Sequence, residues 1–442
     1  MAEIKEIPLK KLIKPWDSGD VNKYAFINAT VIDVETGKCH SDTTVLTSDG
    51  LITKVGNNIE VDRTEYTMVD CQGKYLCPGL IDCHVHIFAA PGGESNLSSI
   101  SSRSPKSAQL LVDNVCNTML SRGFTTVRDT GGIDSTIRKA INDDLVHGPR
   151  LYYSGMALSQ TGGHGDFRSA EDEGTHTCQC HLNAFGRVCD GVPACLEAAR
   201  DELRKGADFI KIMGGGGVAS PADSLTQLQF TAEEIKAITT VTDFAETYTT
   251  AHAYTPQAIK HCVENGVRGI EHGNFIDKET AALMAKTGTF LTPTLITYKI
   301  MGSHQFSDFL SPSSKEKNAK VLEAGVNSLL VAKKAGVKVC YGSDLLGALG
   351  GYQSGEFTLR SQVLSPLEVL QQATINPADM LREKRLGQIK EGKFADMIIL
   401  EKNPLDDITI LDNQPEVIRA VIKSGRVYKS SWNSLPIDVV KP

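Results

Sequence analysis

Two histidines separated by one residue, His84 and His86, end a short apolar run, PGLIDCHVHIFA at residues 78–89. Such a run is typical of a buried strand, on which every second side chain points to the same face. Asp82 would share that face, so three polar groups would be buried together. Burial without partners is costly, and neutral imidazole nitrogens are good ligands for zinc-like ions. The motif therefore predicts either a metal site or a hydrogen-bonded cluster.

Further ionisable residues stand at the ends of other apolar runs. These are Lys211, His252, His272 and Asp344. Each alone has a simpler explanation, because a lysine can reach a solvent edge, a histidine can be a satisfied core residue and an aspartate can cap a helix. Six such residues at matching ends of buried strands are difficult to explain by packing. We therefore expect them to converge on one site.

Lys211 is unusual in this group, because an ammonium cannot bind a metal ion and is costly to bury. Carbon dioxide can convert its amine into a carbamate, which is in effect a carboxylate and could bridge two cations. Four imidazoles and two anionic groups would then suit two divalent metal ions. Zinc is the expected metal, and manganese, cobalt or nickel would fit the same ligands.

The middle of the chain must supply the strands that position these residues. Short apolar runs, expected to be strands, occupy residues 77–86, 124–130, 149–155, 208–214, 248–254, 268–274, 288–294 and 337–344. Helical patterns lie between them at residues 107–122, 193–205, 231–246, 255–265, 278–286, 315–335 and 365–373. Such β-then-α repetition predicts an α/β fold, a (β/α)8 TIM barrel with its active site at the carboxyl ends of the strands.

Both ends of the chain predict β structure instead. Alternating runs from about residue 24 to 75 are broken by Asp49–Gly50, and the runs near the other end by Ser424–Gly425, which are hairpin signals. We expect these pieces to meet as one small β-sandwich domain. The predicted division is 1–75 and 385–442 for the two parts of the sandwich and 76–384 for the barrel.

Long irregular segments are expected after several strands, where barrel loops build the active site. They cover residues 88–106, 155–190, 214–228, 294–312 and 345–360. The glycine run at 214–217 would let the backbone approach the site closely, and it lacks the G-K-[ST] sequence of a phosphate loop.

The composition narrows the class of protein. The 442 residues are 41% hydrophobic and 22% charged, with a net charge of −7, and the diffuse acidic balance argues against nucleic-acid or anionic-membrane partners. No run approaches the length of a membrane span, and the first residues lack an apolar secretory region. The 11 cysteines lack the regular spacing of a disulfide framework. We expect a cytoplasmic protein with reduced thiols that acts on a small-molecule substrate.

Several stretches together resemble the amidohydrolase superfamily of metal-dependent hydrolases, in family order from about residue 24 to 428. They are PGLIDCHVH, GADFIKIMGGGG, TAHAYTPQAI, GIEHG, YGSD, INPADMLR and LGQIKEGKFADMIIL. SGMALSQTGGHGD and AHAYT are similar to the imidazolonepropionase-like branch, which includes Xaa-Pro and N-acyl amino acid carboxypeptidases and a fungal ochratoxin amidohydrolase. The resemblance implies a sandwich completed by both termini and self-association into a homo-oligomer.

The resemblance also implies a binuclear metal centre. Its predicted ligands are His84, His86 and Asp344 for one metal, His252 and His272 for the other, and carboxylated Lys211 bridging both together with a hydroxide. That hydroxide would attack an amide or ester carbonyl, and Asp344 would take its proton and pass it to the leaving amine. Tyr254, on the same strand face as His252, and His164, in TGGHGD, are candidate substrate contacts. For His164 a loop-ordering hydrogen bond is an equal alternative.

The reaction and the substrate stay open at this point. The ochratoxin enzyme has a histidine where this chain has Tyr254, so the resemblance does not fix ochratoxin as the substrate. Lactone hydrolysis or decarboxylation of an aromatic acid would use the same site, deamination is less expected, and a non-catalytic scaffold is the remaining alternative. Arg103, Arg128 and Arg168 could hold a substrate carboxylate or lie on the surface.

A cysteine-rich stretch, THTCQCHLNAFGRVCDGVPAC, has no counterpart in that resemblance. Its candidate ligands for a structural zinc are His176, Cys178, Cys180, His181, Cys189 and Cys195. Because its C-x-C-H order lacks the C-x2-C spacing of common zinc modules, a flexible lid with free thiols is favoured.

Overall fold

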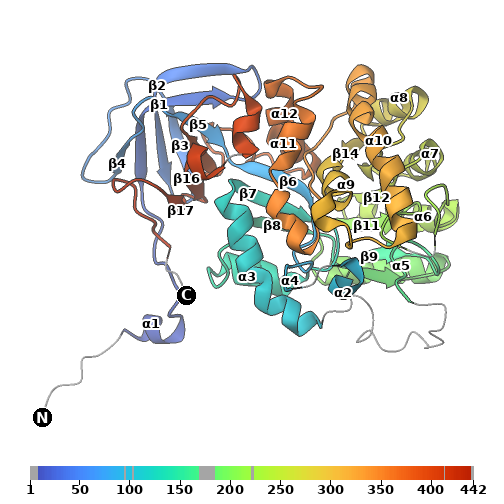
Figure 1. Ribbon diagram of the computed structural model, residues 1–442. Helices are drawn as coiled ribbons and strands as arrows, with labels where there is room; N and C mark the ends of the chain where they lie inside the picture. Colours follow the sequence, from blue (N-terminus) through green and yellow to red (C-terminus); the bar gives the residue numbers. More distant parts are fainter. Residues whose placement is uncertain are drawn as a thin grey trace, which may run out of the picture.

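The computed structural model describes residues 8–93, 96–101, 104–168, 185–220, 223–412 and 414–439. In Figure 1 a β-rich part lies at one side of a larger body of strands and helices. The N-terminal segment with the short helix α1 (Leu9–Ile13) extends from the sheet, and Lys14 after this helix pairs with Asp143 of the larger body. Within these residues, no helix combines the length and the apolar character that a bilayer crossing requires.

One eight-stranded sheet combines strands from both ends of the chain. Its members are β1 (Tyr24–Asp33), β2 (Lys38–Ser48), β3 (Leu51–Gly56), β4 (Thr67–Asp70), β5 (Tyr75–Pro78), β15 (Met397–Leu400), β16 (Ile418–Lys423) and β17 (Arg426–Ser430). The C-terminal half joins the N-terminal half where β15 pairs antiparallel with β5, with Ile398 opposite Cys77. The two termini therefore share a sheet, as expected, and its packing as a two-layer sandwich stays a prediction.

The two predicted hairpins of this sheet are present. Asp49 and Gly50 have φ values of 52° and 78° between β2 and β3, and Ser424 and Gly425 have 48° and 76° between β16 and β17. Two consecutive residues with positive φ match the twist of the flanking strands, which explains the choice of Gly at the second position. The turn residues in the sequence thus fix the register of both hairpins.

Two parallel sheets form the strands of the larger body. One contains β6 (Leu80–Val85), β7 (Phe124–Asp129) and β8 (Arg150–Tyr153). The other contains, in spatial order, β10 (Gly186–Val188), β9 (Ala157–Ser159), β11 (Ile210–Met213), β12 (Thr249–Ala253), β13 (Gly269–His272) and β14 (Phe290–Thr292). Strands buried on both faces need continuous apolar runs, and residues such as Val127, Ile212 and Ile270 supply the core.

The expected third and eighth strands differ from regular strands. The third is observed as β8, which pairs with β7, whereas β9, which pairs with β11, lies in a segment that was expected to be irregular. Residues 337–344 form one bridge, between Leu291 and Val339, instead of a strand. Cys340 N–H donates to Leu291 O at 2.8 Å, and Cys83 N–H donates to Tyr341 O at 2.8 Å. The segment therefore lies between β14 and β6 without the length of an extended ladder.

Helices connect these strands and cover them on the outside (Figure 1). The seven predicted helices are observed as α3 (Pro105–Ser121), α5 (Val192–Arg204), α6 (Ala232–Phe244), α7 (Pro256–Glu264), α8 (Lys278–Thr287), α10 (Pro312–Ala335) and α12 (Pro366–Gln372). Capping side chains mark the starts of several of them. Thr231 and Ser365, for example, form capping boxes at α6 and α12.

Several helices were not predicted, among them α4 (Ser135–Asn142), α9 (Leu295–Met301) and α11 (Gly355–Arg360). The last two fall in segments expected to be irregular. Both are short, and α9 is almost entirely buried, so it has no polar face to produce the 3.6-residue alternation of a surface helix. The remaining short helices are α2 (Leu97–Ser101), α13 (Ile375–Met380) and α14 (Gln414–Val417).

Candidate active site

One pocket brings together all eight residues predicted to do chemistry. They are His84, His86, His164, Lys211, His252, Tyr254, His272 and Asp344. They come from the ends of β6, β11, β12 and β13, from the segment after β9 and from residues 337–344. Parallel strands end at one edge, which is why residues more than 250 positions apart in the sequence meet here.

The two histidines at the end of β6, His84 within the strand and His86 directly after it, face Asp344. Nε2 of His84 and Nε2 of His86 each lie 3.4 Å from Oδ1 of Asp344. The alternation of side chains along the strand thus places both rings as expected. Asp82 does not join them: Ser343 and Gln353 donate to its carboxylate at 2.6 and 2.9 Å, so this carboxylate fixes the neighbouring chain segment.

Residues 337–344 lie so close to β14 and β6 that a larger residue than glycine at position 342 would collide with their side chains. A Cβ on Gly342 would lie 2.5 Å from Thr292 and 3.0 Å from Cβ of His84. Asp344 N–H then donates to the carbonyl of His84 at 2.8 Å. The glycine of the YGSD motif therefore lets Asp344 reach the histidines of β6.

His272 and Asp344 both have backbone conformations that are rare outside glycine. Their φ values are 74° and 51°. Residues held in this left-handed region cost free energy and cluster at functional sites. One donor atom each of His84, His272 and Asp344 lies within 4.8 Å of the others, so two imidazoles and a carboxylate converge as divalent zinc-like ions require. The donor set fits a metal ion.

The charge states of His84, His252, His272 and Asp344 suit metal binding, whereas His86 has a pKa that Asp344 raises despite its burial. Burial lowers the pKa of His84, His252 and His272, that of His272 to about 3, so these rings are neutral at pH 7. Burial alone would raise the pKa of Asp344, but the surrounding histidines hold it well below its ordinary value. Neutral imidazoles and an anionic carboxylate are the forms that coordinate metals.

Lys211 lies inside the pocket with 2% of its surface exposed. Burial lowers the pKa of its amine to about 8, although Glu271 and Asp344 act in the opposite direction. A larger fraction of the amine is therefore neutral near pH 7 than for an ordinary lysine, and the neutral amine is the form that reacts with carbon dioxide.

His164 and His252 are stacked, with ring centroids 4.1 Å apart. Nδ1 of His164 lies 2.7 Å from Oγ of Ser220, and Nε2 of His252 lies 3.2 Å from the carbonyl oxygen of Gly216. A Cβ on Gly217 would overlap the His164 ring. The glycine-rich segment thus packs directly against both rings, and the loop-ordering hydrogen bond considered for His164 exists while its ring still lines the pocket.

Tyr254 is buried and belongs to a hydrogen-bonded chain that the sequence did not indicate. Its hydroxyl oxygen lies 2.8 Å from that of Tyr298, which lies 2.9 Å from Nδ1 of His272. Burial raises the pKa of the Tyr254 phenol, so it remains a neutral hydrogen-bond donor. Tyr298 was missed because it lies on α9, in a segment expected to be a loop.

Two of the three arginines considered for a substrate carboxylate, Arg128 and Arg168, have carboxylate partners within the chain. Arg128 is fully buried and its Nη2 lies 2.6 Å from Oε1 of Glu271, which corrects its assignment as a surface or substrate-binding residue. Nε of Arg168 donates to Asp166 at 2.7 Å. Arg103 lies outside the described residues. Glu271 was itself overlooked, although it directly precedes His272 in GIEHG.

The walls of the pocket above the polar residues are apolar. Their side chains are Leu97, Ile100, Phe167, Phe185, Met213, Val218, Met301 and Leu346. Phe185 packs edge-on against His86, with centroids 5.7 Å apart. Such walls favour a substrate with a large apolar group next to its reacting bond.

The cysteine-rich stretch is only partly described. His176, Cys178, Cys180 and His181 lie outside the described residues. Cys189 and Cys195 are buried, with their sulfurs 3.9 Å apart. The favoured lid therefore stays a prediction, and the structural-zinc alternative is equally untested.

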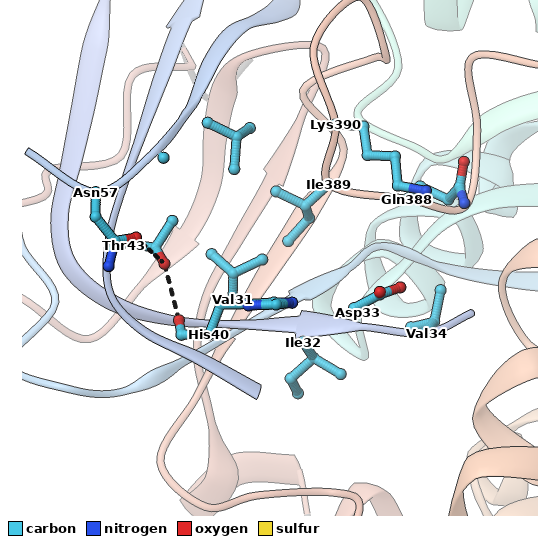
Figure 2. Close-up of a pocket in the computed structure, with 12 residues that line it drawn as sticks. Val31, Ile32, Asp33, Val34, His40, Thr43, Asn57, Gln388, Ile389 and Lys390 are labelled. Atoms are coloured by element: carbon cyan, nitrogen blue, oxygen red, sulfur yellow. Dashed lines mark hydrogen bonds between the residues drawn. The ribbon is translucent and has the colours of Figure 1, made fainter. Parts of the chain in front are cut away.

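A second hollow lies at the terminal sheet (Figure 2). It is lined by β1 and β2 residues such as Asp33 and Thr43, together with Gln388 and Lys390. Thr43 donates to the carbonyl of His40 at 2.9 Å, one of the dashed lines in Figure 2. Within the described chain no cluster of metal-binding side chains lies there, so the chemistry belongs to the first pocket.

Comparison with known proteins places this site in a family. The chain is 30% identical over 426 residues to ochratoxinase from Aspergillus niger, covering 93% of this chain and 88% of that protein. A solved amidohydrolase and a solved prolidase complexed with N-methylphosphonate-L-proline each have a TM-score of 0.89, at 41% and 40% identity, and each comparison covers 93% of this chain and all of the other. The Amidohydrolase family profile matches residues 75–428. The chain belongs to the Amidohydrolase family.

Proposed function

We propose that this protein is a binuclear metal-dependent amidohydrolase that cleaves an amide bond of a small molecule. Family membership makes the chain a hydrolase of carbon–nitrogen amide bonds. The observation that carries the finer proposal is the convergence of six ligand-type residues in one pocket, with both imidazoles of β6 at 3.4 Å from Asp344.

Two divalent ions, with zinc as the expected metal, would be held by these residues. His84, His86 and Asp344 would hold one, His252 and His272 the other, and carboxylated Lys211 would join them. Carboxylation adds carbon dioxide to the neutral amine and releases one proton, so the product is an anionic carbamate. When bound, the ions would supply a nucleophilic water with a pKa near 7 and polarise the substrate carbonyl.

Asp344 has the proposed role in proton transfer, and Tyr254 and His164 have the proposed roles in substrate binding. Asp344, kept anionic, accepts a proton from the attacking water and delivers it to the leaving nitrogen as the carbon–nitrogen bond breaks. The neutral phenol of Tyr254 donates to a substrate oxygen, and His164, which also lines the pocket, makes a second polar contact. The products are a carboxylate and an amine.

The proposed substrates are N-acyl amino acids, Xaa-Pro dipeptides or ochratoxin-like amides. The similarity to an ochratoxinase and to a prolidase supports this set, and the apolar walls support a bulky apolar group on the substrate. We further propose a homo-oligomer and a closed (β/α)8 barrel. Closure is supported by the backbone hydrogen bonds of residues 337–344 to both β14 and β6.

A substrate screen by mass spectrometry tests the proposal. Zinc-loaded protein would be incubated with N-acyl amino acids, Xaa-Pro dipeptides, ochratoxin A, aryl lactones and hydroxybenzoic acids, with Lys211→Ala protein as the control. We expect an amide to be cleaved into acid and amine by the wild-type protein alone. Lactone opening or loss of carbon dioxide with every amide intact would overturn the reaction, and a wild-type protein without bound metal would overturn the metal centre.

A further inference from the structure

A fully buried ion pair lies against the predicted metal site without lining the pocket. Nη2 of Arg128 donates to Oε1 of Glu271 at 2.6 Å, and Oε2 of the same carboxylate lies 2.8 Å from Nδ1 of His84. Thr250 donates its hydroxyl to Glu271 as well. All four side chains are buried, so these contacts are shielded from water.

The carboxylate determines which nitrogen of His84 carries the proton. An ionised carboxylate only accepts hydrogen bonds, so Nδ1 must be the protonated nitrogen facing Glu271. The lone pair of the neutral ring is then on Nε2, the nitrogen that lies 3.4 Å from Asp344. We propose that Glu271 is a positioning residue that fixes the tautomer and the ring orientation of His84, so that Nε2 faces the metal centre.

Arg128 stabilises the ionised carboxylate of Glu271 in its position next to His84. Its Nε donates to the carbonyl of Cys83 at 2.6 Å, so the guanidinium contacts the residue before His84 as well as the carboxylate that orients it. A buried carboxylate needs a countercharge and several donors to remain ionised. Arg128, Thr250 and His84 together provide them, and Glu271 cannot become a competing donor to Nδ1.

A buried ion pair can also serve stability alone, and the chain contains a matched case. Nε of Arg360 lies 2.8 Å from Oε1 of Glu356, and both side chains are fully buried. Glu356 also accepts from the backbone N–H of Ile296 at 2.7 Å, and neither Ile296 nor Arg360 is a predicted ligand. Glu356→Gln therefore removes an equally buried carboxylate without touching His84.

The inference rests on the proposed metal centre, and one experiment separates the two. Zinc affinity of full-length wild-type, Glu271→Gln and Glu356→Gln proteins would be measured by competition with a chromophoric chelator, together with thermal unfolding. Outer partners of metal-binding histidines typically contribute about tenfold to a hundredfold to affinity. We expect that loss for Glu271→Gln alone, whereas both variants unfold at lower temperature.

The outcomes have distinct meanings. Wild-type protein that binds zinc while Glu271→Gln binds it equally tightly, or while Glu356→Gln loses as much affinity, overturns the positioning role. Wild-type protein that binds no zinc overturns the proposed function and this inference with it. If Glu271→Gln does not fold, Glu271→Asp makes the same comparison, because it keeps a charge for Arg128 and withdraws the carboxylate from His84.

Discussion

The hydroxyl oxygens of Tyr254 and Tyr298 lie 2.8 Å apart inside the pocket. Tyr298 also lies 2.9 Å from Nδ1 of His272, so one hydroxyl of α9 links a predicted substrate contact to a predicted metal ligand. A buried hydroxyl in this position restricts the direction in which Tyr254 can donate. The link makes α9 part of the site even though it supplies no predicted ligand.

Removal of the Tyr298 hydroxyl should reduce kcat more than it reduces the stability of the fold. In Tyr298→Phe, Tyr254 loses its partner, and we expect kcat to fall by about tenfold, which corresponds to about 1.4 kcal/mol. Tyr153→Phe is the control, because that buried phenol donates to the carbonyl of Lys205 at 3.1 Å, outside the pocket. Both variants should lose about 1 kcal/mol of unfolding free energy. Equal kcat values in the two variants would contradict the role of Tyr298.

The bridging role of Lys211 predicts a coupled loss of metal and activity. Lys211→Ala should retain at most one metal ion per chain and lose amide hydrolysis, because the anion between the two sites is gone. Lys423→Ala is the matched control: this second buried lysine donates to the carbonyl of Gly148 at 2.6 Å, away from the pocket. The metal content per chain and the rate of amide hydrolysis would be measured for both variants. Full activity in Lys211→Ala would exclude the bridging role of Lys211.

Gly217 is predicted to be indispensable because of its neighbour. A methyl group there would overlap the His164 ring, which cannot retreat because it is stacked on His252 at 4.1 Å. We expect Gly217→Ala to lower kcat/KM by at least about tenfold through misplaced substrate contacts. Gly351→Ala is the control, since a Cβ at Gly351 meets no atom within 4 Å. Similar steady-state kinetics for both variants would show that the ring has room to move.

The metal-free protein should lose stability in mild acid. His272 has a pKa of about 3 in the folded protein against 6.5 in the unfolded chain, so the unfolded chain binds more protons between these values. Stability contributed by neutral His272 is therefore complete above pH 6.5 and falls as the pH decreases, by about 1.4 kcal/mol per unit.

The other ligand histidines act mainly in the same direction. His84 and His252 have lowered pKa values, whereas His86 has a raised one and opposes them. We expect a lower unfolding temperature at pH 5 than at pH 7 after removal of metal with a chelator. An unchanged or higher value at pH 5 would show that these rings are solvated in the metal-free protein.

Much of the site followed from the sequence because strand periodicity is local. The alternation in HVH placed His84 and His86 on one face, and the repeated runs placed the partner residues at the same edge. The left-handed backbone of His272 and Asp344 did not follow from the sequence, because it results from the way the chain leaves the strands. Helix α9 and the Arg128–Glu271 ion pair were not predicted, because both are buried. A buried helix lacks an amphipathic pattern, and no local sequence signal connects Arg128 with Glu271.

The antiparallel pairing of β15 with β5 has a consequence for biosynthesis. Strand β5 ends at Pro78, two residues before β6 begins at Leu80, and β6 leads to the first two predicted ligands, His84 and His86. The pairing partner of β5 is β15, which leaves the ribosome some 300 residues later. Until then, β5 presents an unpaired edge to other chains in the cell. Nascent and truncated chains should therefore depend on chaperones and be prone to aggregation, and ions would be captured only after translation ends.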